Sequence, residues 1–373
     1  MQLPRPLSCR IIWTLIDATS SALLMRKVLL FLLLFFLVVV VGLGAFGSIV
    51  WGRMNEPFKG YTAGEQFVDI PQGSGTQDIG RRLVNGGVVR DLFVFRAALW
   101  WSGRARHLQA GEYRFAEPIS AMQVIDQIAR GAVYTHRITF PEGLTIVEMS
   151  KLYESNGFGP ATDFVTAAGN AALVADIDPA ATDLEGYLFP ETYALARRAP
   201  ASQLVALMVG RFRTAFPEML RQEAQSQGLT TRQVVTLASL VEKETGRPEE
   251  RPLVAAVYRN RYRIGMGMQA DPTVIYALQK AGRYDGNIRR DDLYIDSPYN
   301  TYRYPGLPPG PIASPGQASL EATVRVADVT YLYFVSRNDG SHAFATTLAE
   351  HNRNVQKFQI LYFREKRLRE RGQ

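Results

Sequence analysis

Two glutamates, Glu242 and Glu244, close a predicted helix over residues 230–245 and carry the clearest chemical potential in the chain. Thr230, with Gln233 three residues later, forms a capping-box pattern that begins this helix. At about 100° per residue, Glu244 lies beside the apolar stripe of the helix. Glu242 lies about 200° around the helix from Glu244, so the two should not act as a pair. A carboxyl group set against apolar side chains holds its proton to higher pH, as a general acid must. The alternative is that both acids only decorate the last turns of the helix.

Other classes of chemistry lack the residues they require. The four histidines lie far apart without the spacing of metal ligands, and the single cysteine, Cys9, precedes a long apolar run. We therefore expect neither a metal site nor a disulfide in the part that follows. No nucleophile-elbow motif is present, and Gly73-Ser74-Gly75 lacks the third glycine of a dinucleotide fingerprint. We expect no cofactor.

Carboxylates lie beside aromatic and amide side chains in four segments, residues 184–193, 238–246, 269–276 and 297–302. Aromatic rings can stack on the apolar faces of sugars, while amide and carboxyl groups bond sugar hydroxyls. Core packing explains any single tyrosine of these segments more simply. The four segments together nevertheless have the composition of a saccharide cleft.

The apolar run near the N-terminus predicts a membrane anchor. No charged residue occurs between Lys27 and Arg53, and residues 28–41 contain only Val, Leu and Phe. This run is long enough to cross about 30 Å of hydrocarbon. A cleaved signal peptide is the alternative, but the run is long for one and residues 51–53 make a poor cleavage site. Arg26 and Lys27 precede the span, so the positive-inside rule places the N-terminus in the cytoplasm and the rest outside.

The formal net charge of +7 is concentrated at the two ends of the chain. The first 56 residues contribute +3 from five basic and two acidic residues, and the tail from Lys357 contributes +4 from six and two, so the part between is neutral. A nucleic-acid-binding domain would concentrate basic charge on its folded part. We therefore predict no nucleic-acid partner and interpret the basic tail as a solvated helix end.

The remaining pattern predicts an α+β fold. Strands are predicted at 67–70, 108–115 and 133–140, and helices at 76–85, 91–101 and 120–130. Asp91 is expected to cap the second of these helices. A helix is then predicted between Gly143 and Asn156, and others near 201–215, 230–245, 250–263 and 272–281. Ser314-Pro315 opens a further helix, a β-hairpin follows at 331–346, and a final helix begins near Leu348. The long segment 284–315 is irregular and rich in Tyr, Pro, Gly and Asn. A loop of this length is usually functional or disordered, and its aromatic content argues against disorder.

The motifs of the second half resemble those of a known family, the endolytic murein transglycosylases or YceG-like proteins. They are Leu184-Glu185-Gly186, Glu242-Lys243-Glu244-Thr245, Asp271-Pro272-Thr273-Val274-Ile275-Tyr276, Tyr299-Asn300-Thr301-Tyr302, Gly306-Leu307-Pro308-Pro309-Gly310-Pro311-Ile312 and Tyr331-Leu332-Tyr333-Phe334-Val335. They follow the order of the family over most of residues 137–360. The resemblance implies an inner-membrane protein with one span and a periplasmic domain that cuts glycan strands internally. The catalytic glutamate of the family corresponds to Glu244.

The expected architecture combines these observations. It comprises a cytoplasmic N-terminus (1–27), a single transmembrane helix (28–51), a linker (52–66), a small LysM-like α+β module (67–136) and a mainly helical catalytic domain with a β-hairpin (137–373). Met25-Arg26-Lys27 is a natural start for such an anchor, and residues 1–24 show no pattern that we interpret. The likeness to LysM rests on a strand, a Gly-containing turn and a helix, so a docking or spacer role for the module stays open.

The resemblance also implies a mechanism with one carboxyl group. Glu244 is expected to protonate the oxygen between N-acetylmuramic acid and N-acetylglucosamine, and then to take a proton from the 6-hydroxyl, which closes a 1,6-anhydro ring. Glu185 is the second candidate for catalysis, although orienting substrate is its expected role. We expect Glu242 to bond the backbone or a neighbour at the cleft wall. The residues expected to line the cleft are Gln269, Asp271, Tyr299 and Asn300.

Two other functions stay open. A non-catalytic scaffold would bind peptidoglycan or its synthases without forming product. A hydrolase with two carboxylates would leave reducing ends instead of anhydro ends. For the transglycosylase, the expected partners are peptidoglycan glycan strands and a peptidoglycan synthase, beside which an anchored enzyme would cut nascent strands and end their elongation.

Overall fold

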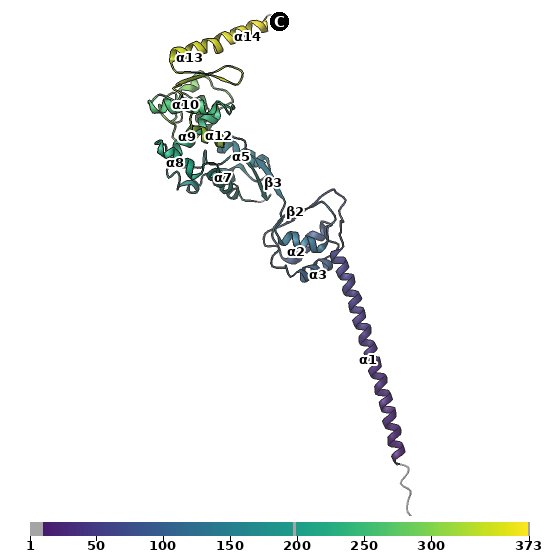
Figure 1. Ribbon diagram of the computed structural model, residues 1–373. Helices are drawn as coiled ribbons and strands as arrows, with labels where there is room; N and C mark the ends of the chain where they lie inside the picture. The colour runs from purple at the N-terminus through teal and green to yellow at the C-terminus, as the bar shows by residue number, and fades with distance from the viewer. Residues whose placement is uncertain (1–9, 197–198, 372–373) are drawn as a thin grey trace, which may run out of the picture. The chain divides into compact units, whose positions relative to one another are not determined.

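The structure is a computed structural model that describes residues 10–196 and 199–371. It divides into two compact units, Met1–Tyr134 and Thr135–Gln373, which are coloured from purple to blue and from blue to yellow (Figure 1). The segment 1–27, predicted to be cytoplasmic, lies partly outside the described residues. Cys9 is among the residues that the structure does not describe.

The long helix α1 (Arg10–Asn55) contains the predicted membrane anchor (Figure 1). Its part Met25–Asn55 is long and apolar enough to cross a membrane. The Val, Leu and Phe side chains of residues 28–41 are all exposed, because no other part of the chain that the structure describes covers them. A helix that is apolar all round requires an apolar environment, so α1 is compatible with a single-pass anchor.

The rest of the first unit is a small α+β module. Strand β1 (Gln66–Ile70) pairs antiparallel with β2 (Gly111–Phe115), with Val68 opposite Tyr113. Helices α2 (Thr76–Asn85), α3 (Leu92–Ser102) and α4 (Ala121–Ala129) complete the module. The predicted cap of α3 is confirmed, because the Asp91 Oδ1 atom accepts from the Val94 amide at 2.8 Å. The order is therefore strand, two helices, strand and helix, around one apolar core.

Residues 52–66, which we expected to form a linker, pack on this module. Helix α1 continues through Asn55, and Met54 is buried in the core of the module. Phe58 forms a β-bridge with Ile119, and the Tyr61 hydroxyl donates to the Phe115 carbonyl oxygen at 2.9 Å. The anchor and the module are thus joined through packed residues rather than through a free tether.

The second unit is mainly helical. Its helices are α5 (Ile146–Ser155), α6 (Ala161–Ala168), α7 (Ala201–Ala215), α8 (Glu218–Ser226), α9 (Thr231–Glu244), α10 (Arg251–Arg263), α11 (Asp271–Lys280), α12 (Gln317–Val324), α13 (Leu348–Val355) and α14 (Tyr362–Arg371). Short 3-10 turns lie at Ala171–Val174 and Arg290–Tyr294, and a π-helical segment at Gln356–Leu361 joins α13 to α14. The segment predicted to be irregular, 284–315, contains no helix or strand apart from the short 3-10 turn at 290–294.

Two antiparallel strand pairs complete the second unit. Strand β3 (Thr135–Thr139) pairs with β4 (Thr192–Ala196), and β5 (Tyr333–Ser336) pairs with β6 (His342–Ala345) as the predicted hairpin. Our sequence analysis did not predict β4, nor helices α6 and α8. In β4, Tyr193 and Leu195 are buried and alternate with exposed neighbours, so period-2 patterning was present but too short to stand out.

Helix α9 lies at the centre of the second unit (Figure 1). All residues from Val234 to Val241 are buried. Val234, Val235 and Ala238 belong to one apolar cluster, while Leu237, Leu240 and Val241 belong to another. A helix packed on both sides in this way is held firmly, and it ends at the candidate catalytic residue.

Candidate active site

Glu244 is the last residue of α9. The predicted capping box at the other end of this helix is present, because the Thr230 Oγ1 atom accepts from the Gln233 amide at 3.2 Å and Gln233 Oε1 accepts from the Thr230 amide at 2.9 Å. The helix ends where Thr245 takes an extended conformation, at φ −138°. Gly246 and Pro248 follow directly and lie outside the helix. The carboxyl group of Glu244 therefore projects from the final turn of a buried helix.

The nearest partner of Glu244 is a buried tyrosine of α10. The Tyr258 hydroxyl donates to the Glu244 Oε1 atom at 2.8 Å. The side chain of Tyr258 is 1% exposed, and its ring meets that of Phe334 edge-on at 6.0 Å between centroids. A tyrosine that is buried and bonded in this manner fixes the position of the carboxyl oxygen that accepts from its hydroxyl.

The protonation of Glu244 reflects its burial and its charged neighbours. Burial raises the pKa of the Glu244 carboxyl to about 7, and the negative charge of Asp271 acts in the same direction. The hydrogen bond from Tyr258 and the charges of His342 and Arg261 lower this pKa. Burial outweighs them, as is typical when a carboxylate loses water. A group that titrates near neutral pH can both donate and accept a proton.

Arg261 supplies a buried positive charge to this site. Its guanidinium donates to the carbonyl oxygens of Leu332 and Met268, both at 2.6 Å, and stands over the ring of Tyr333 at 5.5 Å. The residue is 8% exposed. Since carbonyl oxygens rather than carboxylates take its donors, its charge remains available to act on Glu244.

His342, the first residue of β6, is held by the glutamate that precedes α10. The Glu250 carboxylate accepts from the His342 amide at 2.9 Å and lies 2.7 Å from its Nδ1 atom. Burial raises the pKa of Glu250, but these bonds with His342 lower it by more, so that the net direction is down. Glu250 is thus a carboxylate at neutral pH, and it orients the imidazole of His342.

The motifs at 269–276 and 299–302 are joined through two threonines. The Thr301 Oγ1 atom accepts from the Ala270 amide at 3.1 Å and lies 2.9 Å from Thr273 Oγ1. The Tyr302 hydroxyl donates to the Asp271 Oδ1 atom at 2.5 Å. Exposed Gln269 has a φ of 50°, which is uncommon outside glycine. Gln269 and Asp271 therefore lie at the surface on a segment of fixed shape.

Glu242 bonds the backbone, as expected for a residue on the other side of the helix. Its Oε2 atom accepts from the Gly316 amide at 2.9 Å, and its Oε1 atom lies 3.2 Å from the Arg251 Nη2 atom. The side chains of Glu242 and Arg251 are 6% and 11% exposed. This buried pair ties the end of α9 to the start of α10 and of α12.

Glu185 lies in a second cluster, which is buried. Its carboxyl group accepts from the Ile146 amide at 3.1 Å and from the Tyr276 hydroxyl at 3.2 Å. Burial raises the pKa of Glu185 to about 8. Tyr299 lies beside Tyr276, with ring centroids 4.8 Å apart. Because Glu185 is 6% exposed and already bonded on both oxygens, the geometry fits a supporting carboxyl group at the start of α5.

Asn300 does not line a surface. It is fully buried, and its amide nitrogen donates to the carbonyl oxygens of Leu293 and Ile295, both at 2.9 Å. Its Oδ1 atom accepts from the Tyr302 amide at 3.1 Å. Asn300, which we expected to line the cleft, instead shapes the loop that carries Tyr302.

The structure thus separates the predicted residues into groups. Asp271 belongs with Glu244, while Gln269 lies on the same segment as Asp271. Glu185 and Tyr299 form the second cluster, and Glu242 and Asn300 support the backbone. Sequence analysis missed Tyr258, Arg261 and Glu250. Tyr258 and Arg261 continue the stripe of Val254 at four- and three-residue spacing, so an arginine on an apolar helix face was the available signal.

No group of three or more metal-ligating side chains occurs within residues 10–196 and 199–371.

The chain is similar to known proteins over most of its length. The profile of the YceG-like family matches residues 68–357. A protein of Bacillus subtilis named endolytic murein transglycosylase is 28% identical over 84% of this chain and 90% of its own length. A protein of Streptococcus pneumoniae with the same name is 29% identical over 77% of this chain and 57% of its own length. The crystal structure of a YceG-like protein from Listeria monocytogenes, at 29% identity, covers 78% of this chain and 98% of its own with a TM-score of 0.53.

The buried pair of Glu242 predicts a large loss of stability on truncation. Glu242→Ala leaves the buried Arg251 charge with only its longer, 3.5 Å contact to the half-exposed Glu142, and we expect the free energy of unfolding to fall by about 3 kcal/mol. Pulse proteolysis of the full chain in detergent across a urea series measures this loss. The matched control is Glu249→Ala, since the Glu249 side chain is 66% exposed in its pair with Arg247, and its cost should stay below about 1 kcal/mol. An equal loss of unfolding free energy in the two variants would show that the buried Glu242–Arg251 pair stabilises the protein no more than an exposed pair does.

The hydrogen bond from Tyr258 predicts the direction in which the Glu244 pKa moves. Tyr258→Phe removes a bond that stabilises the carboxylate, so burial and Asp271 act with less opposition and the pKa should rise above about 7. Titration of ¹³C-labelled glutamate carboxyl groups by NMR measures this, with Glu244→Gln to identify the signal. Tyr304→Phe is the control, because exposed Tyr304 bonds Asp296 instead, and it should leave the Glu244 signal unchanged. An unchanged or lower pKa in Tyr258→Phe would contradict this account of the site.

Proposed function

The chain belongs to the YceG-like family, and on that premise we propose that it is an endolytic murein transglycosylase, which cuts peptidoglycan glycan strands internally. Relatives of this name match most of the chain. The observation that carries the proposal is the carboxyl group of Glu244, which is partly buried, bonded by Tyr258 and given a pKa of about 7. Such a group is suited to a reaction in which one residue gives a proton and later takes one back.

The proposed reaction breaks the β-1,4 bond between N-acetylmuramic acid and N-acetylglucosamine. Protonated Glu244 donates its proton to the glycosidic oxygen, which leaves as a hydroxyl of N-acetylglucosamine as the bond to the anomeric carbon breaks. The resulting carboxylate takes the proton of the 6-hydroxyl of the same muramic acid, and that oxygen bonds the anomeric carbon. The product is a 1,6-anhydro end, and Glu244 regains its proton. The step needs no water and balances without an added reagent.

The neighbouring groups have distinct proposed roles in this cycle. Asp271 helps Glu244 hold its proton before cleavage, because a nearby negative charge disfavours a second one. Arg261, His342 and the Tyr258 hydroxyl stabilise the carboxylate that remains after the proton is given. Gln269 and Tyr302, which lie at the surface beside Asp271, are proposed to contact the sugar. Glu185, Glu242 and Asn300 are proposed to support the site, as is Tyr299 through its ring contact with Tyr276.

One observation favours a second reaction. Asp271 is an exposed carboxylate close enough to Glu244 to affect its pKa, and a pair of carboxyl groups is what a glycoside hydrolase uses. In that case Asp271 would activate water and the product would carry a reducing end. A scaffold that binds peptidoglycan or its synthases without cleavage is the remaining alternative.

The proposed location follows from α1. We place the chain in the cell inner membrane as a single-pass protein, with the N-terminus cytoplasmic and the catalytic unit periplasmic, on the basis of the apolar helix and the basic residues before it. The module at 67–136 is proposed to be LysM-like and to bind or space the glycan. Cleavage of nascent strands next to a synthase would end their elongation.

Analysis of digestion products by mass spectrometry tests the proposal. The purified full chain in detergent should release fragments with 1,6-anhydro ends from intact peptidoglycan. Glu244→Gln, which can still accept the Tyr258 bond, should lower their rate of formation by about 100- to 10,000-fold. Glu249→Gln is the matched control, being an exposed glutamate five positions along the chain, and it should retain activity.

The other outcomes identify the alternatives. Fragments with reducing ends would establish a hydrolase, and binding without fragments would establish a scaffold. Undiminished anhydro ends from a folded Glu244→Gln variant would show that another residue is the acid.

A further inference from the structure

Helix α3 is apolar on both of its faces. Its inner face, made of Val94, Phe95, Ala98 and Leu99, is buried in the core of the module. Its outer face carries Phe93, Trp100 and Trp101, which are 58%, 80% and 57% exposed. Soluble proteins rarely expose large aromatic side chains together. The outer face of α3 therefore requires an apolar covering.

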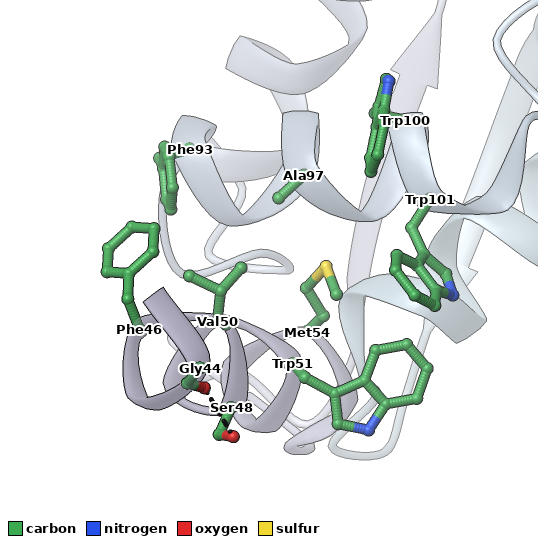
Figure 2. A pocket seen from close by; sticks show the side chains of 11 residues that line it. Gly44, Phe46, Ser48, Val50, Trp51, Met54, Phe93, Ala97, Trp100 and Trp101 are labelled. Atoms are coloured by element: carbon green, nitrogen blue, oxygen red, sulfur yellow. Dashed lines mark hydrogen bonds between the residues drawn. The ribbon is translucent and has the colours of Figure 1, made fainter. Parts of the chain in front are cut away.

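This outer face adjoins the last turns of α1 (Figure 2). The ring of Phe93 lies 6.4 Å from that of Phe46, and the ring of Trp101 lies 4.9 Å from that of Trp51 in an edge-on contact. Between the two helices lies a groove of about 660 Å³, lined almost entirely by apolar side chains. The exposed surface of α3 is thus continuous with the apolar surface of the predicted anchor.

The length of the anchor places these residues at the level of the lipid headgroups. The uncharged part of α1, residues 28–52, is about 37 Å long, whereas the hydrocarbon layer is about 30 Å thick. If Lys27 marks one boundary of the hydrocarbon layer, the other boundary falls roughly five residues before Arg53. Trp51 lies just beyond that boundary, and tryptophan is enriched at membrane interfaces. Because α3 contacts residues 46 and 51, it lies at the same level.

The charges around α3 fit this position. Arg96 on the outer part of α3 and Arg106 just beyond its end are both exposed. Long basic side chains reach from an apolar surface toward lipid phosphates. Aromatic and basic residues on the open face of a short helix are typical of a helix lying in the interface.

We propose that α3 lies in the interface of the bilayer that α1 spans, with Phe93, Trp100 and Trp101 among the upper parts of the lipid chains. This inference depends on the membrane anchor proposed above and not on the reaction. The covering of the outer face is lipid, and the module is held against the membrane through two helices. Its packed connection at residues 52–66 agrees with such a fixed position.

Tryptophan fluorescence of the full chain tests the proposal, because the four tryptophans are Trp13, Trp51, Trp100 and Trp101. The chain carrying Trp13→Phe and Trp51→Phe reports on α3 alone. It is reconstituted at low protein-to-lipid ratio into vesicles of phosphatidylethanolamine and phosphatidylglycerol. Phospholipids brominated near the headgroup should remove most of its emission, those brominated near the chain ends should remove less, and aqueous iodide should have little effect.

Two further variants serve as controls. The chain with Trp13→Phe, Trp100→Phe and Trp101→Phe leaves Trp51 as the reporter of the anchor, and it should also be quenched by brominated lipid. The chain with all four tryptophans replaced by Phe and with Met219→Trp carries a reporter on α8, where Met219 is 74% exposed. That emission should be quenched by iodide and not by lipid.

The remaining outcomes would overturn the proposal in distinguishable ways. If Trp51 is quenched by lipid while the α3 reporter responds only to iodide, the anchor stands and α3 faces water. If the α3 reporter is shielded from both quenchers, a protein surface covers it. If Trp51 also fails to respond to lipid, the anchor itself is wrong.

Discussion

Glu244 must hold a proton near neutral pH and still be able to release it, and its surroundings favour each state by different means. Loss of water at the end of α9, together with the negative charge of Asp271, favours the protonated form. The hydroxyl of Tyr258 and the positive charges nearby favour the carboxylate. The balance places the pKa at about 7. Without burial, Glu244 would be an ordinary exposed glutamate, and its neighbours alone would not keep its carboxyl group protonated near neutral pH.

The rest of the second unit can be understood as the support for this balance. Helix α9 is packed on both sides, so its last residue has a fixed position. Helix α10 contributes Tyr258 and Arg261 from one face, and the β5–β6 hairpin closes over them through Phe334 and the Arg261 bond to Leu332. Segments distant in sequence meet here because buried polar groups are bonded, as at Thr301 and Glu250.

Much of this arrangement could be predicted where a local rule applies. The capping box at Thr230, the cap at Asp91 and the apolar stripe of α9 each depend on residues three or four apart, and the family resemblance pointed to Glu244. Contacts between distant segments were out of reach. The hydrogen bond from Tyr258 to Glu244 joins two helices. The side-chain amide of Asn300 donates to carbonyl oxygens of its own loop, and Glu185 is buried between α5 and α11. A residue type indicates what a side chain can do, but only the packing decides whether it faces substrate or backbone.

The most direct test of the proton balance at Glu244 is the pH dependence of kcat/KM for strand cleavage by the unmodified chain. This quantity reports the free enzyme, and the general acid must be protonated at the start of the reaction. The rate should be maintained at low pH and fall tenfold per pH unit above about 7. A rate that already falls above the ordinary glutamate value, or that stays constant through pH 7 into the alkaline range, would contradict the assignment of Glu244 as the acid.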